Sequence, residues 1–435
     1  MRPFRFLHAA DLHLDSPFRG LTHLPPAIRD YIRESTFMAL QRMVQVAKFE
    51  QVDFVLISGD IYDLSDRSLR AQLRFQQAML SLSEAGIHVY LIHGNHDAED
   101  GSRARLNWPA NVHVFGSETV GTIPYVTDDG LTVATISGIS YAKASVTDNL
   151  VPRFPTPAEG VYSIALLHTN VDGDASHDNY APCTKEQLIK SGYQYWALGH
   201  IHSRRVLHQQ QGSSLIVYPG NIQGRSVKET GAKGCYIVDV SNMGDSELSF
   251  HATEAVRWEQ RSISIHLLQD EQELKDMLDQ FIAELRDELP GIPVVVRLTL
   301  TGRGRLHHML QQGTQLEELL HELRDEQARV AASDTQATSF IWIESCRVET
   351  GAEIPFDQLL EQESFIGDML RLSESLLNDE ELLRQLCTEA LSPLYSKMKA
   401  SRWLQELDLE QMQTWIRAAR ERNADELSGE GGWSV

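Results

Sequence analysis

Side chains with the chemistry of metal ligands follow apolar segments in the first half of the chain. Each apolar segment has the length of a buried strand, and the polar residue comes at or just after its end. Aspartate, histidine and asparagine together suit a divalent cation such as Mn²⁺, Fe²⁺ or Zn²⁺, and no cysteine takes part. The residues are Asp11, His13, Asp60, Asn95, His168, His200 and His202.

The spacing of these residues suggests two cations. Residues two apart in extended backbone point to the same side, so a pair with that spacing can face one site. Gly59 allows a sharp turn that places Asp60 at the end of its strand, where open α/β sheets bind ligands. Because a carboxylate has two oxygens, we expect Asp60 to bridge two cations about 3.5–4 Å apart. The pairs with i, i+2 spacing are Asp11 with His13 and His200 with His202.

The apolar segments and the helical patterns between them predict a layered α/β domain. Helices are expected over 27–49 and 68–85. Three later strands, over 132–139, 214–218 and 234–240, are expected in a second sheet packed on the first, which gives a two-sheet α/β sandwich. The strands that lead to the ligands are expected over 4–10, 52–57, 88–92, 162–167 and 195–198.

The pattern changes after about residue 255. Strands and helices alternate there in a small α/β module, with strands expected over 261–267, 294–301 and 340–348 and helices over 270–289 and 315–331. From Pro355 onward the chain is rich in leucine at helical spacing. The predicted domains are a two-sheet α/β domain over 1–255, a small α/β domain over 256–352 and a helical C-terminal region over 353–435.

The composition places the acidic charge in one part of the chain. The net charge is −22, of which −5 falls in residues 1–250 and −17 in residues 251–435. The first part therefore leaves room for local basic patches, whereas the second is a poor surface for DNA. No apolar run is long enough for a membrane span, no signal peptide is evident and the four cysteines form no CxxC pair. We therefore expect a cytoplasmic protein with reduced thiols.

The ordered set of motifs resembles the calcineurin-like metallophosphoesterase superfamily. More narrowly, it is similar to the SbcD-type DNA-repair exonucleases. The resemblance covers about residues 1–250, and the module after it matches the capping domain of that family in position and size. The motifs are D-x-H at 11–13, G-D-x-x-D at 59–63, G-N-H-D at 94–97, His168, G-H-x-H at 199–202 and Y-P-G-N at 218–221.

The resemblance implies a two-metal site that normally works with Mn²⁺. A hydroxide activated by both ions would attack phosphorus in line, without a phosphoenzyme. It assigns the first ion to Asp11, His13, Asp60 and His202. It assigns the second ion to Asp60, Asn95, His168 and His200.

The resemblance also implies two residues that act on catalysis without binding a metal. His96 would face the phosphate and either stabilise the transition state or protonate the leaving oxygen, and Asp97 would orient His96. One departure concerns Asp63, because archaeal and eukaryotic nuclease relatives carry a histidine there that helps position DNA. This difference weakens the transfer of DNA-specific detail and leaves the metal site unaffected.

Basic residues follow several of the ligand segments and are expected to form a positive rim for a phosphate backbone. For any single residue, a solvated surface charge is an equally good interpretation. The candidates for substrate binding are Arg67, Arg103, Arg105, Arg204 and Arg205.

Three functions remain open on this basis. The first is a Mn²⁺-dependent DNA exonuclease or endonuclease, for which the resemblance implies a homodimer and an SbcC-type coiled-coil ATPase partner docked on the helical segment. The second is a phosphoesterase for small phosphodiesters or phosphoproteins, which would use the same metal ligands. The third is a binding scaffold without activity, which the complete ligand set disfavours.

Overall fold

The computed structural model of the chain contains two compact units. The first is Met1–Gln260 with Leu285–Val296 and Arg324–Glu344, and the second is Arg261–Glu284 with Arg297–Leu323 and Ser345–Val435. The domain boundaries predicted near 255 and 352 stay predictions. The structure describes residues 1–18, 21, 24–63, 68–99, 106–127, 129–174, 178–210, 212–333, 339–395 and 408–428.

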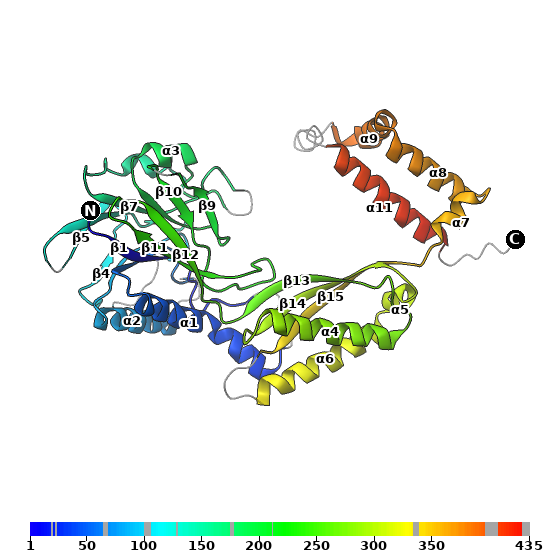
Figure 1. The fold of residues 1–435 in the computed structure, drawn as a ribbon, viewed down its shortest axis with the longest axis horizontal. Helices are drawn as coiled ribbons and strands as arrows, with labels where there is room; N and C mark the ends of the chain where they lie inside the picture. The colour runs from blue at the N-terminus through cyan, green and yellow to red at the C-terminus, as the bar shows by residue number, and fades with distance from the viewer. Residues whose placement is uncertain are drawn as a thin grey trace. The chain divides into compact units, whose positions relative to one another are not determined.

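The first unit contains two six-stranded sheets packed face to face (Figure 1). The order of strands is β12-β11-β1-β2-β3-β4 in the first sheet and β5-β6-β7-β8-β10-β9 in the second. The strands of the first sheet are β1 (Phe4–Ala9), β2 (Phe54–Ser58), β3 (His88–Ile92), β4 (Val112–Val114), β11 (Gly234–Val240) and β12 (Ser246–Ala252). Those of the second are β5 (Gly121–Val126), β6 (Thr132–Gly138), β7 (Tyr162–His168), β8 (Tyr195–Gly199), β9 (Arg205–His208) and β10 (Leu215–Tyr218).

Alternation along the central strands builds two cores. In β1, Phe6 points between the sheets and Leu7 points to the opposite face. Phe6 stacks on Phe54 of β2 with ring centroids 5.2 Å apart and meets the edge of Tyr195 from the second sheet at 5.0 Å. Burying one such side chain stabilises the fold by about 1.5–3 kcal/mol. These contacts hold the two sheets together and confirm the predicted sandwich.

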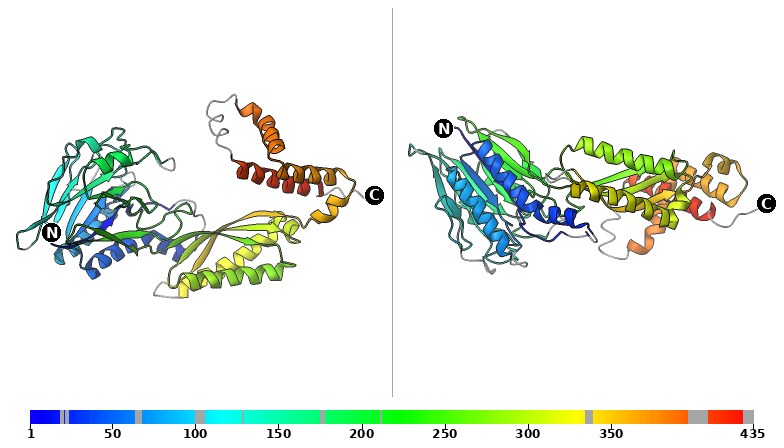
Figure 2. Two further views of the ribbon diagram at one scale, coloured as in Figure 1. Left: turned by 45° about the horizontal axis from the view of Figure 1, so that its top comes forward. Right: turned by 90° about the horizontal axis from the view of Figure 1, so that it is seen from below.

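Helices cover the outer face of the first sheet. They are α1 (Pro26–Phe49) and α2 (Leu69–Glu84), which lie side by side in both views of Figure 2 and agree with the predicted helices. Phe37 of α1 and Phe75 of α2 are buried in the core beneath them. The short helix α3 (Lys185–Lys190) contributes Leu188 to the core on the outer face of the second sheet.

One strand lies in the other sheet from the one expected. The prediction that 234–240 belongs to the second sheet is wrong, because β11 pairs antiparallel with β1, with Phe4 opposite Val240. Most of β11 is buried, as is β1, so the sequence pattern alone does not specify the partner of either strand. The pairing covers the edge of β1 that would otherwise stay open.

The parallel strands bring their carboxyl ends to one edge of the sandwich. β1, β2 and β3 are parallel neighbours in the first sheet, and β7 and β8 are parallel neighbours in the second. The chain after β2 and the end of β7 meet at this edge, since Asp60 Oδ2 lies 3.4 Å from His168 Nε2. This edge is where ligands bind in open α/β sheets.

The rest of the chain contains the predicted α/β module and helical segment. A third sheet has the order β13-β14-β15, and no helix of the described residues is long and apolar enough to cross a membrane. In the second unit, Leu383, Cys387 and Met412 form a small core between α9 and α11. The elements are β13 (Arg257–Ser264), α4 (Glu271–Glu288), β14 (Val294–Arg303), α5 (His307–Gln312), α6 (Thr314–Ser333), β15 (Ile341–Gly351), α7 (Phe356–Glu361), α8 (Phe365–Asn378), α9 (Glu380–Tyr395) and α11 (Leu409–Ser428).

Candidate metal centre

Several of the predicted ligands have unusual backbone dihedral angles. Only a few non-glycine residues adopt positive φ in ordinary structure, and such residues gather at functional sites. Four of the predicted ligands adopt it, with φ of 53° at Asp11, 43° at His13, 52° at Asp60 and 104° at His200. Two of the loops are joined by hydrogen bonds from the amide of Asp11 to Gly59 O (3.1 Å) and from the amide of His13 to Asp60 O (3.0 Å).

Asp60 lies at the middle of the cluster. Its Oδ2 is 3.7 Å from His13 Nε2 on one side and 3.4 Å from His168 Nε2 on the other, and its Oδ1 accepts a hydrogen bond from the amide of His96. Burial by itself would raise the pKa of Asp60, but the neighbouring His168 and His13 outweigh burial and hold that pKa below its ordinary value. One carboxylate therefore faces two groups of potential ligands.

On the first side, the Nε2 atoms of two imidazoles face each other. His13 Nε2 and His202 Nε2 are 3.2 Å apart. The Nδ1 atoms of these histidines face carboxylates, His13 with Asp63 at 2.9 Å and His202 with Glu229 at 2.7 Å. A carboxylate only accepts, so each Nδ1 carries the proton. Burial lowers the pKa of His13 to about 4, so its Nε2 has a lone pair at neutral pH.

Asp11 completes this first group. Ligand atoms of Asp11, His13 and His202 all lie within 4.8 Å of one another. Asp11 is buried, and burial raises its pKa above the ordinary value although His202 and His168 oppose this. A buried carboxyl beside two facing imidazole nitrogens is stabilised by a positive charge, which a bound cation would supply. The donor set therefore fits a divalent metal ion.

On the second side, His168 faces two oxygens. Its Nε2 is 2.9 Å from Asn95 Oδ1, and its Nδ1 donates to Ser58 O at 3.0 Å. Burial would lower the pKa of His168, but the charge of Asp60 outweighs burial and raises it to about 9. The oxygens of Asp60 and Asn95 therefore favour a positive charge beside His168, and a second cation would supply that charge.

His200 lies beside this second group. Its ring centroid is 5.2 Å from that of His168, and its amide donates to Asp11 Oδ1 at 3.0 Å. The carbonyl of Asp178 is 2.8 Å from His200 Nε2, which makes Nε2 the protonated atom and leaves the lone pair on Nδ1. The structure therefore brings all seven predicted ligands together, and their assignment to two ions stays a prediction.

His96 is placed differently from the ligands. Its side chain is 46% exposed, whereas that of His13 is fully buried. Its Nδ1 lies 2.8 Å from Asp63 Oδ1. Burial opposes the charged form, but the hydrogen bond to Asp63 and the charges of Asp60 and Asp63 outweigh it, so the pKa of His96 lies above its ordinary value. A partly exposed imidazole with a raised pKa is suited to contact an anionic substrate.

Asp97 accepts hydrogen bonds mainly from backbone amides of the neighbouring loops. Its carboxylate accepts from the amides of Ile61 (2.9 Å) and Gly94 (2.7 Å) and faces His93 Nδ1 at 3.0 Å. Asp97 thus joins the loops after β2 and β3. The carboxylate seen on His96 is that of Asp63, and the role predicted for Asp97 as the residue that orients His96 stays a prediction.

Gly94 allows the close packing around Asp60. A Cβ atom at this position would lie 2.4 Å from Asp60 Oδ1 and 2.7 Å from His168 Cε1, which are forbidden distances. We expect Gly94→Ala to displace both side chains and to weaken Mn²⁺ binding by about 10- to 100-fold, as changes around metal ligands do. Calorimetric titration with Mn²⁺ measures this.

A matched control is Gly116→Ala, where the nearest atom to an added Cβ, Glu99 Oε1, is 4.0 Å away. It should bind Mn²⁺ as the unaltered protein does. Equal Mn²⁺ affinities for the Gly94 and Gly116 variants would contradict the packing argument.

The five predicted substrate-binding arginines divide into three groups. Arg67, Arg103 and Arg105 lie outside the described residues. The guanidinium of Arg204 stacks on the ring of Phe250 at 3.8 Å from its centroid and is exposed. Arg205 forms an ion pair with Asp174 and is 44% exposed.

Several residues of the cluster were not predicted from the sequence to contact the metal ligands. Glu229 and Asp63 each hold one imidazole of the first group, and Arg225 lies 3.5 Å from the carboxylate of Asp63. The buried hydroxyl of Tyr141 donates to His168 O at 2.7 Å. Asp63 occurs in the G-D-x-x-D motif, but Glu229 and Arg225 follow the Y-P-G-N motif without a pattern of their own.

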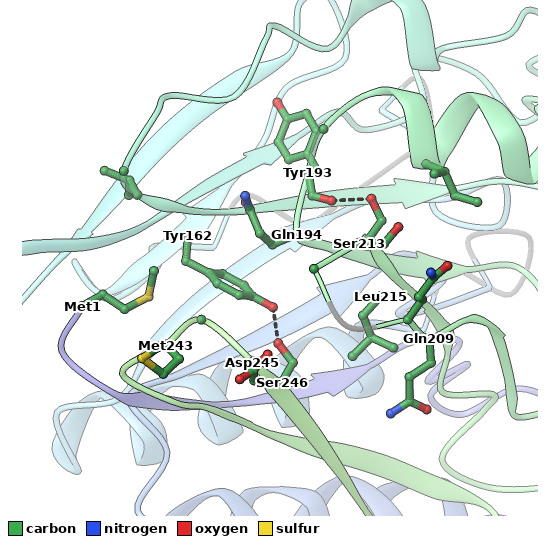
Figure 3. A pocket seen from close by; sticks show the side chains of 18 residues that line it. Met1, Tyr162, Tyr193, Gln194, Gln209, Ser213, Leu215, Met243, Asp245 and Ser246 are labelled. Atoms are coloured by element: carbon green, nitrogen blue, oxygen red, sulfur yellow. Dashed lines mark hydrogen bonds between the residues drawn. The ribbon is translucent and has the colours of Figure 1, made fainter.

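A pocket elsewhere in the first unit lies at the opposite edge of the second sheet. Tyr162, Gln194 and Leu215 line it (Figure 3), and they lie at or just before the first residues of β7, β8 and β10. The ligand loops follow the last residues of β7 and β8, so this pocket is separate from the metal cluster.

Comparisons with known proteins agree with this geometry. A family model described as calcineurin-like phosphoesterase matches residues 4–204, and one described as the middle domain of metallophosphoesterase YhaO matches residues 258–351. The uncharacterized metallophosphoesterase YhaO of Bacillus subtilis is 39% identical, over 78% of this chain and 79% of that protein.

More distant relatives are named as nucleases or repair proteins. The DNA double-strand break repair protein Mre11 of Methanococcus maripaludis is 25% identical over 56% of this chain and 65% of its own length. A subunit of the nuclease SbcCD from Staphylococcus saprophyticus is 25% identical over 55% of this chain and 66% of its own length. From the family model, the similarity to YhaO and the ligand cluster, the chain belongs to the calcineurin-like metallophosphoesterases, a family of metal-dependent phosphoester hydrolases.

Proposed function

We propose that this protein is a Mn²⁺-dependent DNA nuclease, with exonuclease or endonuclease activity, that works in DNA repair. The observation that carries the proposal is the grouping of imidazole, carboxylate and amide donors on both sides of Asp60. DNA as the substrate is supported by relatives named as a DNA repair protein and as part of a nuclease.

The residues that would hold the first ion are Asp11, His13, Asp60 and His202. Those that would hold the second are Asp60, Asn95, His168 and His200. Two such ions would lower the pKa of a bound water and would neutralise the charge of the phosphate oxygens. Carboxylate, imidazole and amide donors without a thiolate suit Mn²⁺.

Residues of the chain would position the phosphodiester and donate a proton to the leaving oxygen. The side chain of His96 is 46% exposed, and its Nδ1 lies 2.8 Å from Asp63 Oδ1, which leaves Nε2 as the nitrogen that would contact the substrate. In that position His96 donates a proton to the leaving oxygen or stabilises its negative charge. Asp60 accepts from the amide of His96 and so fixes the backbone of this residue relative to the cluster.

Arg204 is the described rim residue best placed for a phosphate of the DNA backbone. Phe250 supports one face of its guanidinium, and no ion pair of Arg204 occurs among the described residues. Arg205 has the carboxylate of Asp174 as its partner. Arg67, Arg103 and Arg105 stay proposed members of the same rim.

We expect Arg204→Gln to weaken duplex DNA binding and to reduce the slope of log affinity against log salt concentration by about 1. Binding measured at several salt concentrations checks this. Arg205→Gln is the matched comparison and should change the slope less, because Asp174 already neutralises Arg205. An unchanged slope for Arg204→Gln would remove this residue from the DNA contact.

The assembly is proposed to be a homodimer with an SbcC-type coiled-coil ATPase in the cytoplasm. For the homodimer, α2 offers Leu69, Leu73 and Leu80, which are 53%, 47% and 47% exposed at helical spacing. For the ATPase, support comes from the acidic helical segment after residue 355 and from the relative that is named as one part of SbcCD.

The deciding experiment is a Mn²⁺ titration of cleavage of end-labelled duplex DNA, with bis-p-nitrophenyl phosphate as a second substrate. The proposal expects Mn²⁺-dependent cleavage of DNA, and addition of a candidate ATPase should change its rate. Hydrolysis of the small diester without cleavage of DNA would instead favour a phosphoesterase for small phosphodiesters or phosphoproteins.

A further inference from the structure

Arg225 lies behind the first group of ligands, between two carboxylates. Its Nη1 is 3.5 Å from Asp63 Oδ2 and its Nη2 is 3.9 Å from Glu229 Oε1. The side chain is 17% exposed, and those of Asp63 and Glu229 are 12% and 15% exposed. One guanidinium thus faces two largely buried negative charges.

Each of these carboxylates already holds an imidazole. Asp63 Oδ1 faces His13 Nδ1 at 2.9 Å, and Glu229 Oε1 faces His202 Nδ1 at 2.7 Å. The opposite nitrogens of these rings are the two that lie 3.2 Å apart. A carboxylate on Nδ1 sets the tautomer and the direction of Nε2 and raises its basicity toward a metal. The orientation of both rings therefore depends on where Asp63 and Glu229 stand.

The loop that carries Arg225 is itself anchored by Glu229. Glu229 Oε2 accepts from the amide of Arg225 at 2.7 Å and from Asn221 Nδ2 at 2.9 Å. On the other side, Ser16 donates its hydroxyl to Asp63 Oδ2 at 2.5 Å. Arg225 therefore forms a second connection between these two groups of hydrogen bonds, in addition to the contact between His13 and His202.

Within the part of the chain that the structure describes, one donor of the Arg225 guanidinium lacks an ordinary hydrogen bond. Among the described residues, the buried Nε of Arg225 has no hydrogen-bond partner. Natural structures seldom leave a buried donor unpaired without a reason. The position of Arg225 between two carboxylates gives such a reason. A guanidinium in that position holds Asp63 and Glu229 in place, although its Nε donor stays unpaired within the described part of the chain.

We propose that Arg225 is a positioning residue for the first metal ion, acting through Asp63 on His13 and through Glu229 on His202. This inference rests on the proposed metal site. Arg225 has two opposed effects on a cation: its charge repels the ion, while its fork-shaped guanidinium holds the two carboxylates. The proposal is that the second effect is the larger.

Two substitutions separate these effects. Arg225→Lys keeps the positive charge but has no planar fork to span two carboxylates, whereas Arg225→Met removes both charge and fork. We expect both variants to bind the first Mn²⁺ about 10- to 100-fold more weakly, with the second ion little affected. Calorimetry and the electron paramagnetic resonance signal of free and bound Mn²⁺ measure the binding without any turnover.

Activity adds an independent readout. If Arg225 acts through the metal ligands, hydrolysis of bis-p-nitrophenyl phosphate by both variants should recover at high Mn²⁺ concentration. Arg153→Lys is the matched control, since Arg153 is exposed and its guanidinium donates to the carbonyl of Glu118, away from the cluster. Thermal unfolding in the absence of metal should show that the Arg225 variants are folded.

Several results would overturn the inference. Tighter Mn²⁺ binding by Arg225→Met, with Arg225→Lys unchanged, would mean that charge repulsion is the larger effect. A loss of activity that Mn²⁺ does not restore would place Arg225 on the substrate instead. Unchanged Mn²⁺ binding in both variants would overturn the role of Arg225 alone, whereas an unaltered protein that binds no Mn²⁺ would overturn the metal site as well.

Discussion

Asp60→Asn should reduce hydrolysis by at least about 1,000-fold, which corresponds to the several kcal/mol of transition-state stabilisation that metal ions supply. Asp60 Oδ2 lies 3.7 Å from His13 Nε2 and 3.4 Å from His168 Nε2, so this one carboxylate contacts both groups of ligands. Asparagine replaces one of its oxygens with an NH₂ group, which donates where a cation needs a lone pair. The loss should therefore affect both ions at once.

The measurement combines Mn²⁺ stoichiometry with kcat/KM for bis-p-nitrophenyl phosphate at saturating Mn²⁺. Asp148→Asn is the matched control, because Asp148 lies exposed in a loop and the substitution is the same. It should keep both ions and full activity. Two bound Mn²⁺ ions and near-normal turnover in the Asp60 variant would contradict the bridging role.

The positions of the ligands could be predicted because strand ends impose them. Asp60 comes two residues after the end of β2, and His168 is the last residue of β7. Since buried parallel strands are short apolar runs, their ends are visible in the sequence, and the carboxyl ends of parallel neighbours meet at one edge. The order and spacing of these residues along the chain are then enough to predict that the ligands lie close together.

The carboxylates and the arginine behind the ligands could not be predicted in the same way. Arg225 is 162 positions from Asp63, and their contact depends on how two loops pack after both sheets have formed. Charged residues in loops are common, and nothing in their local sequence distinguishes a partner of an imidazole from a solvated charge. The placement of β11 next to β1 was missed for a related reason, since an apolar strand fits either sheet.

His96→Ala should keep both metal ions and lower DNA hydrolysis by about 100-fold or more, as loss of a general acid does. The ring of His96 is 46% exposed and lies close to His13 and Asp63, in a group separate from the one formed by Asp11, His13 and His202. Its amide, which donates to Asp60 Oδ1, is retained in alanine. The change should therefore remove the side chain from the opening without disturbing Asp60.

The choice of substrate separates the two roles open to His96. Proton donation matters most for a poor leaving group such as the sugar oxygen of DNA and least for p-nitrophenolate, which leaves without a proton. If His96 donates the proton, DNA cleavage should fall much more than hydrolysis of bis-p-nitrophenyl phosphate. Equal losses on both substrates would indicate that His96 acts by stabilising negative charge on the phosphate. Unchanged turnover on both would exclude His96 from the reaction.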